Sequence, residues 1–304
     1  MPAPLRARLR RWVIDVLSQD RSAPDYDRPV GDPGLFGPET ATWKIHADFP
    51  SMMAGGLASL MLQALHPLAL AAVWDHSDFS TDVLGRLRRT IAFVARTTYA
   101  PHAVAEQAIE RVRTVHGRIH GHAADGRAYS ANDPHLLTWV HCAEAWCFLR
   151  GYQTYCQASV PAAAQNRYLS ETARVAESLG ARDVPTSLAE LERYFVAIRP
   201  ELVCDARTVE VLAVLETIRL PIPMAGLGRG VFLGAGAALL PSWTRALMQR
   251  GPLARSGDQA AMQALRLLAP NLRSAMAEGG LAWRACARVG TDYEALFNWP
   301  PEDA

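Results

Sequence analysis

The stretch MMAGGLASLMLQALHPLALAAVW, residues 52–74, decides the fold. It contains no charged side chain, and alanine, glycine and leucine supply most of it. It is about as long as a membrane span, which needs roughly 20 apolar residues. However, Gln63 and the pair His66-Pro67 interrupt its middle, where a polar group and a lost backbone hydrogen bond are unfavourable in lipid. We therefore predict a buried central helix, closely packed by other helices, and no stable membrane insertion.

Helical patterns continue through most of the chain after this stretch. Apolar residues of 83–94 recur at the spacing of one helix face, and Ser80-Thr81-Asp82 predicts where this helix begins. A third helix is predicted after Pro101, and a long one follows the N-cap Asp133. Between these two helices, the turn-rich residues 121–134 are interpreted as a loop. Further helices are predicted over residues 162–180, 186–197, 205–218, 258–267 and 270–287.

Period-two alternation of apolar residues is scarce, so the sequence predicts no sheet. The glycine-rich residues 226–243 follow a helical pattern rather than a strand, and we interpret their glycines as close helix packing rather than phosphate binding. The fold expected is all-α. Residues 1–45 are predicted to form an N-terminal helix and an irregular arm, and residues 46–300 a single large helical domain.

Composition excludes several classes of function. The chain has 304 residues, half of them apolar, and a formal net charge of +1. It has no basic stripe, so we expect no nucleic-acid partner. Its five cysteines include no CxxC pair, which argues against a disulfide framework or a zinc ribbon. The first residues show no secretory signal, and the predicted location is cytoplasmic.

All nine histidines lie between His46 and His141. His116 and His120 are four residues apart in the predicted third helix, on the face that carries Ile109. An imidazole on an apolar face is either a hydrogen-bonded core residue or a ligand for iron, zinc or copper. The sequence has no HExxH motif, and Arg118 between the two histidines disfavours a bare divalent ion. Both interpretations therefore stay open at this point.

Other polar residues in the same half of the chain could belong to a site. Arg86, Arg89 and Thr90 share a face of the predicted second helix. They form either a solvated basic face or a wall for an anionic ligand or an iron-bound oxygen. If His66 is buried in the charge-free stretch, it needs a polar partner. His76, in the run Asp75-His76-Ser77-Asp78, could cap a helix junction or face a site.

The order of several of these runs resembles the family of latex-clearing protein, the rubber oxygenase, and the MpaB-type oxygenases. Each run is weak alone, but the ordered series covers most of the chain. The matching runs are LQALHPLALAAVWDHSDF (62–79), GRLRRTIAFVARTTY (85–99), VHGRIHG (115–121) and YSANDPHLLTWVH (129–141), with a weaker match in LPIPMAGLGRGVFLGAGAALLPSWTR (220–245).

The resemblance implies an all-α fold around a buried haem b, with dioxygen as co-substrate. The axial ligand of the family falls on His116, with His120 as the rival. The arginine and threonine beside the haem fall on Arg86 and Thr90. The family's distal lysine is replaced by Arg89, which stays charged and is a poor iron ligand.

No residue matches the catalytic glutamate of the rubber oxygenase, and Asp75 and His76 are the nearest polar candidates. Together with the missing secretion signal, this departure argues against rubber as the substrate.

We therefore hypothesise a haem-dependent oxygenase or oxidase for a small apolar molecule, which could carry an alkene or an isoprenoid chain. Cleavage, hydroxylation and desaturation, including of a biosynthetic intermediate, all stay open. One alternative is a non-enzymatic haem carrier or sensor. Another is a non-haem metal oxidoreductase that uses His116 and His120. The sequence determines neither the substrate nor the oligomeric state.

Overall fold

The computed structural model describes residues 7, 10–11, 25–76, 83–157, 159–217 and 225–299. Nearly all of its regular structure is helical, so the predicted all-α class is confirmed. The helices of the first half are α2 (Ala41–His46), α3 (Phe49–Gln63), α4 (Pro67–His76), α5 (Val83–Tyr99), α6 (His102–His116) and α7 (Pro134–Tyr155).

The second half is helical as well. Its elements are α8 (Ala162–Leu179), α9 (Leu188–Ile198), the 3₁₀ turn η1 (Arg199–Glu201), α10 (Ala206–Glu216), α11 (Ala225–Leu239), α12 (Ser242–Leu247), α13 (Pro252–Ala277), α14 (Leu281–Val289) and a second 3₁₀ turn, η2 (Tyr293–Phe297).

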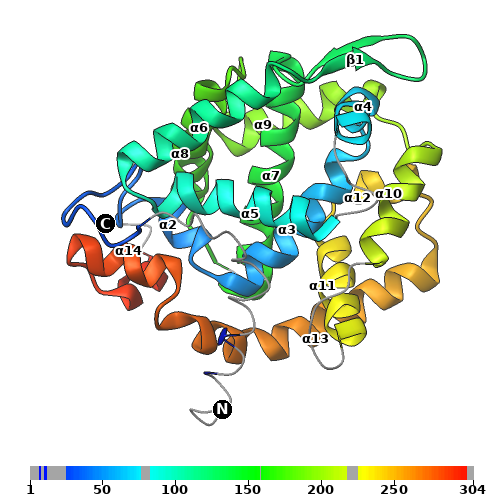
Figure 1. Cartoon of the computed structure of the whole chain (residues 1–304). Coiled ribbons are helices and arrows are strands. Elements are labelled where there is room, and N and C mark those ends of the chain that lie inside the picture. The colour runs from blue at the N-terminus through cyan, green and yellow to red at the C-terminus, as the bar shows by residue number, and fades with distance from the viewer. Residues whose placement is uncertain are drawn as a thin grey trace.

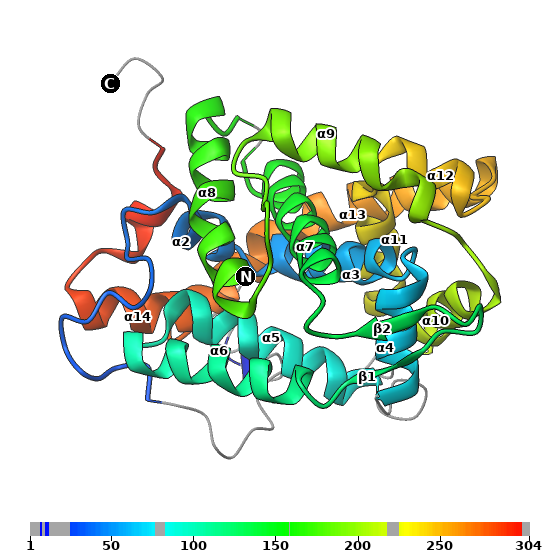
Figure 2. The same ribbon diagram turned by 90° about the horizontal axis from the view of Figure 1, so that it is seen from above.

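Helix α3 lies at the centre of the molecule, packed by α7, α11 and α13 (Figures 1 and 2). It begins at Asp48, whose side chain accepts the backbone N–H of Ser51 as an N-cap. The predicted central helix is thus present and largely buried, but it does not continue through residue 74. Instead α3 and α4 meet at 104° around His66.

The break follows from the dipeptide His66-Pro67. Proline has no N–H and is tolerated only in the first turn of a helix, where Pro67 begins α4. The ring of His66 accepts the backbone N–H of Ala69 at 3.5 Å. In the described part of the chain, no single helix is long and apolar enough to cross a membrane, and this bent pair passes that test only when its two helices are taken together.

Glycines let the central helices approach closely. A Cβ on Gly55 of α3 would lie 2.8 Å from the carbonyl oxygen of Cys147 in α7. A Cβ on Gly151 would lie 2.7 Å from the carbonyl oxygen of Ser51, and one on Gly236 of α11 would lie 2.9 Å from that of Ala54. The glycines of residues 226–243 therefore include one that serves close helix packing, as the sequence predicted.

This packing makes a testable contrast between two adjacent glycines. We expect Gly55→Ala to lower the free energy of unfolding by about 1–3 kcal/mol, because its methyl group meets backbone that cannot move aside. Gly56→Ala should be neutral or stabilise by up to about 1 kcal/mol, since its methyl group meets only the Phe148 ring at 3.8 Å. Chemical denaturation of both variants measures the difference, and equal stabilities would contradict close backbone contact at Gly55.

Several predicted boundaries differ from the structure. Residues 120–130 contain a short antiparallel hairpin, β1 (His120–His122) and β2 (Ala128–Ser130), where a loop was predicted. Strands of three residues are too short to show an alternating pattern. Residues 258–267 and most of 270–287 are helical as predicted, but the break predicted between them is wrong, because α13 continues through Pro270 to Ala277 and α14 begins at Leu281. The predicted N-cap Ser80-Thr81-Asp82 lies outside the described residues.

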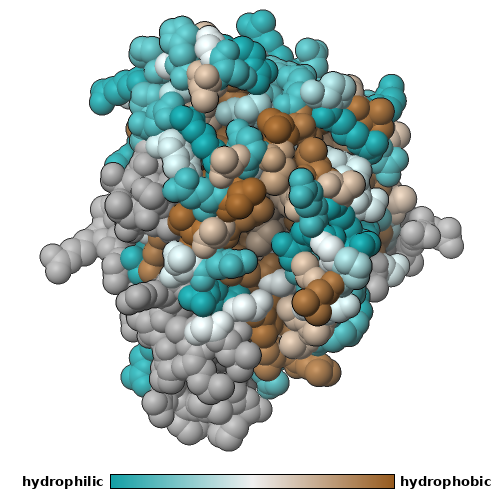
Figure 3. All heavy atoms as spheres, turned by 90° about the vertical axis from the view of Figure 1, so that its right-hand side faces the viewer, coloured by the Kyte–Doolittle hydropathy of each residue, from teal (hydrophilic) through white to brown (hydrophobic). Residues whose placement is uncertain are grey.

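Helix α13 has a buried inner face, but it also exposes leucine side chains at the surface. Its inner face buries Leu265 and Ala269, whereas Leu253 and Leu267 are 87% and 79% exposed. Figure 3 shows the face at the right-hand side of Figure 1, where apolar side chains also reach the surface between polar ones. Single exposed apolar side chains are normal on protein surfaces and need no further explanation.

Candidate functional site

An apolar pocket lies between α3, α5, α7 and α14. It holds about 1080 Å³ of empty space, part of which is open to solvent. Most of its lining side chains are aliphatic, thioether or aromatic; they include Met52, Met53, Leu60, Leu87, Ile91, Val94, Phe148, Leu281 and Trp283. Ligand pockets are typically lined by apolar side chains with a few polar groups that fix orientation. This pocket therefore suits an apolar organic molecule.

Glu144 of α7 is the one carboxyl group among the described residues that line the pocket. Burial raises its pKa to about 7, although a hydrogen bond with Gln63 opposes this shift. Gln63 in turn donates to the Ser59 hydroxyl at 2.6 Å, and both of these α3 residues line the pocket. Near neutral pH the pocket wall thus carries a group that can hold or release a proton.

Two half-buried imidazoles, those of His46 and His141, line a second, smaller cavity together with this carboxyl group. His46 of α2 bonds through Nδ1 to the Thr98 hydroxyl at 2.9 Å and through Nε2 to the Tyr168 hydroxyl at 3.0 Å. Burial lowers its pKa to about 3. Burial also lowers the pKa of His141 to about 4, and its buried Nε2 has no hydrogen-bond partner among the described residues. Both rings are neutral at physiological pH.

The raised pKa of Glu144 predicts a pH dependence of stability. The folded state keeps the Glu144 proton up to about pH 7, whereas the unfolded chain releases it near about pH 4.3. Between these values the folded state binds more protons, so this group lowers the free energy of unfolding as pH rises. Glu144→Gln cannot ionise and should be more stable than wild type by about 1–3 kcal/mol near pH 8.

Denaturant unfolding across pH measures this effect as a difference between the two proteins. The difference matters because His46 and His141, with lowered pKa values, give the opposite slope. Their stability contribution is lost as pH falls from about 6.5 towards their folded pKa values. A Glu144→Gln curve parallel to wild type from acid to alkaline pH would contradict the raised pKa of Glu144.

The residues expected around a haem lie beside the pocket, where α5 packs against α6. Thr90 lines the pocket, and its hydroxyl donates to the carbonyl of Arg86 at 3.3 Å. Arg86 directly precedes Leu87, which also lines the pocket. Burial, and then the charge of Arg89, lowers the pKa of Arg86 to about 10. The guanidinium therefore keeps its charge at neutral pH.

His116 is the last residue of α6 and is half-buried. Burial, together with the charge of Arg86, lowers its pKa, so the ring is neutral and has a free lone pair. Its Nδ1 is buried and has no hydrogen-bond partner among the described residues. A buried imidazole nitrogen without a partner requires an explanation, and a bound metal supplies one.

The structure does not bring the remaining predicted residues to this pocket. His120 is exposed on β1, because α6 ends at His116, so the shared helix face expected for these two histidines does not form. Arg89 is exposed on α5. Asp75 and His76 bond instead to the hydroxyl of Tyr129, at 2.8 and 3.1 Å, and hold the hairpin against α4.

His66 also lies elsewhere. It is fully buried and faces His135 and Glu201 rather than the pocket. Glu144 and His46, which the sequence patterns did not mark as site residues, do line the pocket with Thr90. The sequence does contain an indication for Glu144, because its carboxylate falls within the apolar pattern of the long helix α7. Burying a charged group is unfavourable unless it is paired or has a function.

The described residues thus form an all-α domain with an apolar pocket at its central helices, and the neutral imidazole of His46 and one carboxyl group, that of Glu144, lie in the pocket wall. Residues 43–273 match the family described as ER-bound oxygenase mpaB/B'/rubber oxygenase, catalytic domain. The chain belongs to this oxygenase family, as its sequence motifs indicated. Searches of curated proteins and of solved structures gave no match.

The residues present fit a haem, the group that the resemblance implies. A haem site needs an imidazole with a free lone pair, cationic groups for the propionates and an apolar slot. His116 offers a buried nitrogen without a partner among the described residues, Arg86 offers a half-buried cation, and Leu87 and Thr90 of the same helix line the apolar pocket.

Proposed function

We propose that this protein is a haem b-dependent oxygenase or oxidase that acts on a small apolar molecule, with dioxygen as co-substrate. The observation that carries the proposal is the buried, unpartnered Nδ1 of His116 beside the charged Arg86. It coincides with membership of an oxygenase family. The apolar pocket that Leu87 and Thr90 line supports a substrate that is bound mainly by hydrophobic contacts.

Each residue has a defined task in this proposal. His116 would hold the iron through its unprotonated nitrogen, and Arg86 would pair with a propionate group. When bound, the haem supplies the activation of dioxygen, which is chemistry of the cofactor. Thr90 would present its hydroxyl oxygen as an acceptor at the pocket wall, and the apolar side chains would exclude water from the reacting centre.

Glu144 would be the proton-handling group of the pocket. A general acid or base works best when its pKa lies near the working pH, and burial brings the pKa of Glu144 to about 7. Its carboxyl group can therefore accept or return a proton at the substrate side. Glu144 would have this role rather than Asp75 or His76, because those two residues bond to Tyr129 outside the pocket.

The experiment uses the full chain, expressed with a haem precursor. We expect a Soret band, and we expect oxygen uptake when an isoprenoid alkene is added but none with its saturated analogue. A Soret band without oxygen uptake on any apolar substrate would contradict the oxygenase assignment and favour a haem carrier. Absence of a Soret band from the wild-type protein would overturn the haem proposal.

A further inference from the structure

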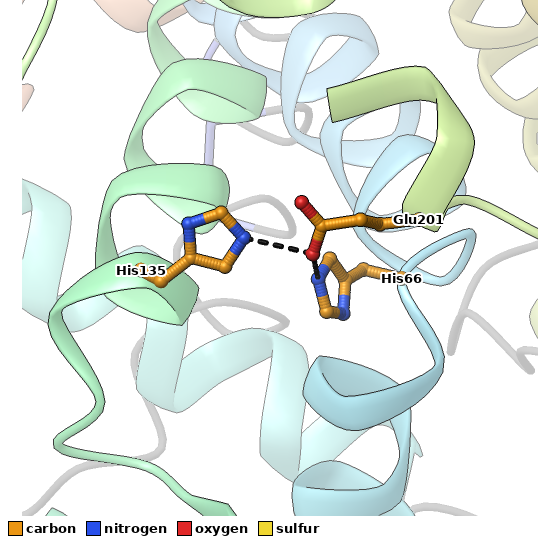
Figure 4. A group of neighbouring side chains, drawn as sticks. All are labelled: His66, His135 and Glu201. Carbon is orange, nitrogen blue, oxygen red and sulfur yellow. Dashed lines mark hydrogen bonds and ion pairs between the residues drawn. The ribbon is translucent and has the colours of Figure 1, made fainter. Parts of the chain in front are cut away.

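A second group of metal-binding side chains lies away from the apolar pocket. His66, His135 and Glu201 come from the α3–α4 junction, the first turn of α7 and η1. One ligand atom from each lies within 4.8 Å of the others. Figure 4 shows the carboxylate of Glu201 between the two rings. Three segments far apart in the sequence thus direct ligand atoms at one point.

The distances suit a small divalent ion. Nε2 of His135 lies 2.9 Å from Oε2 of Glu201, and Nε2 of His66 lies 3.5 Å from the same oxygen. Ligands at the usual zinc distances of 2.0–2.1 Å in a tetrahedral arrangement are separated by about 3.3 Å. The two observed separations lie on either side of this value, so an ion could enter with only small side-chain movements.

One of the three ligands has no adequate partner of its own. The side chain of His66 is 0% exposed, and its Nε2 makes no hydrogen bond among the described residues, although it points at the cluster. A neutral imidazole is the form that binds transition metals.

Hydrogen bonds from backbone N–H groups hold the segments that carry the ligands in place, independently of the cluster. Val203 N–H donates to the Leu65 carbonyl at 2.8 Å, which fixes the η1 segment beside the junction that carries His66. The side chain of Asp133 accepts the backbone N–H of His135 at 2.9 Å as the N-cap of α7. The geometry is therefore built by the fold, as preorganised sites require.

The charges and solvent access around the cluster are compatible with an ion. Arg127, whose charge acts on Glu201 and His66, is paired with Asp125 at 2.7 Å. The side chains of His135 and Glu201 are 48% and 42% exposed, so the outer side of the cluster is open to water. Three protein ligands and one water complete a tetrahedral shell.

We propose that His66, His135 and Glu201 bind one divalent transition-metal ion of the zinc or ferrous class, which ties the α3–α4 junction to α7 and η1. Two imidazoles and one carboxylate are a ligand set that these ions prefer. Binding at Nε2 of His66 places the ring proton on Nδ1. The long 3.5 Å hydrogen bond that Nδ1 accepts from the Ala69 amide is then lost.

The test uses untagged full-length protein titrated with Co²⁺ and with Zn²⁺. We expect one equivalent of Co²⁺ to produce visible d–d absorption, and Zn²⁺ to displace it and raise the Tm. His135→Ala and Glu201→Gln change half-exposed side chains, so these variants should fold and bind at least about 100-fold more weakly. His122→Ala is the matched control, because His122 is an exposed histidine outside the cluster.

His66→Asn separates coordination from helix capping. Asparagine is a good N-cap residue, so this variant keeps a cap for α4 but loses the imidazole ligand, and it should not bind Co²⁺. Wild-type affinity in His135→Ala and Glu201→Gln, or no binding by wild type, would overturn the proposal and leave the three residues as a hydrogen-bonded cap. None of these outcomes depends on haem, which His116 would hold elsewhere.

Discussion

Replacing His116 with alanine is expected to abolish the Soret band or to weaken haem binding at least about 100-fold. Loss of an outer-shell partner alone typically weakens metal affinity by about 10–100-fold, and this substitution removes the proposed ligand itself. The protein should still fold, because His116 is only half-buried at the end of α6. Titration of the apoprotein with haem, followed by absorption, measures the change.

The matched control is His120→Ala. It removes an exposed imidazole four residues further on, at the start of β1. We expect its haem affinity to equal that of wild type. Loss of the Soret band in His120→Ala with retention in His116→Ala would reverse the ligand assignment. Exogenous imidazole should partly restore the spectrum of His116→Ala, because it can occupy the space left by the missing ring.

The largest loss of stability is expected from Asp48→Ala. Asp48 is 0% exposed and accepts from Arg273 Nε of α13 at 2.5 Å. The same carboxylate caps α3 by accepting the Ser51 N–H at 3.2 Å. Removing Asp48 leaves the charge of Arg273 without its partner, but the Arg273 side chain is 24% exposed and keeps part of its hydration, so the expected loss is about 3 kcal/mol, at the lower end for buried pairs. Loss of the cap adds to this in the same direction.

Urea or thermal unfolding measures the loss, with two controls. Asp48→Asn keeps the cap but removes the charge, so it should be less destabilising than Asp48→Ala. Asp27→Ala breaks an exposed pair with Arg284, in which Asp27 is 57% exposed, and should change stability by no more than about 1 kcal/mol. Similar losses in Asp27→Ala and Asp48→Ala would show that burial of the Asp48 pair has no energetic weight.

Most of the helices could be predicted from the sequence, because their signals are local. The spacing of Leu87, Ile91 and Val94 predicted α5, and Asp133 predicted the beginning of α7. The continuation of α13 through Pro270 could not be predicted in this way. Proline removes one helical hydrogen bond, but burial of Leu265, Ala269 and Ala275 holds the helix together on both sides of it.

The candidate site could be predicted only in part. Arg86 and Thr90 were found because one helix carries them four residues apart, and His116 because the resemblance placed it. Thr90 alone of the three lines the pocket, and His116 lies near Arg86 because α6 packs on α5. The shared face of His116 and His120 was a wrong prediction, since it assumed a helix that continues past His116.

The sequence by itself determined the helical class, the charge-free centre and the family. These depend on residue type, spacing and motif order along the chain. Only the tertiary structure decided that Glu144 and His46 share one pocket and that Glu201 meets His66 and His135. Such residues lie on different helices, and their distances and pKa values depend on which helix faces pack and how completely packing removes water.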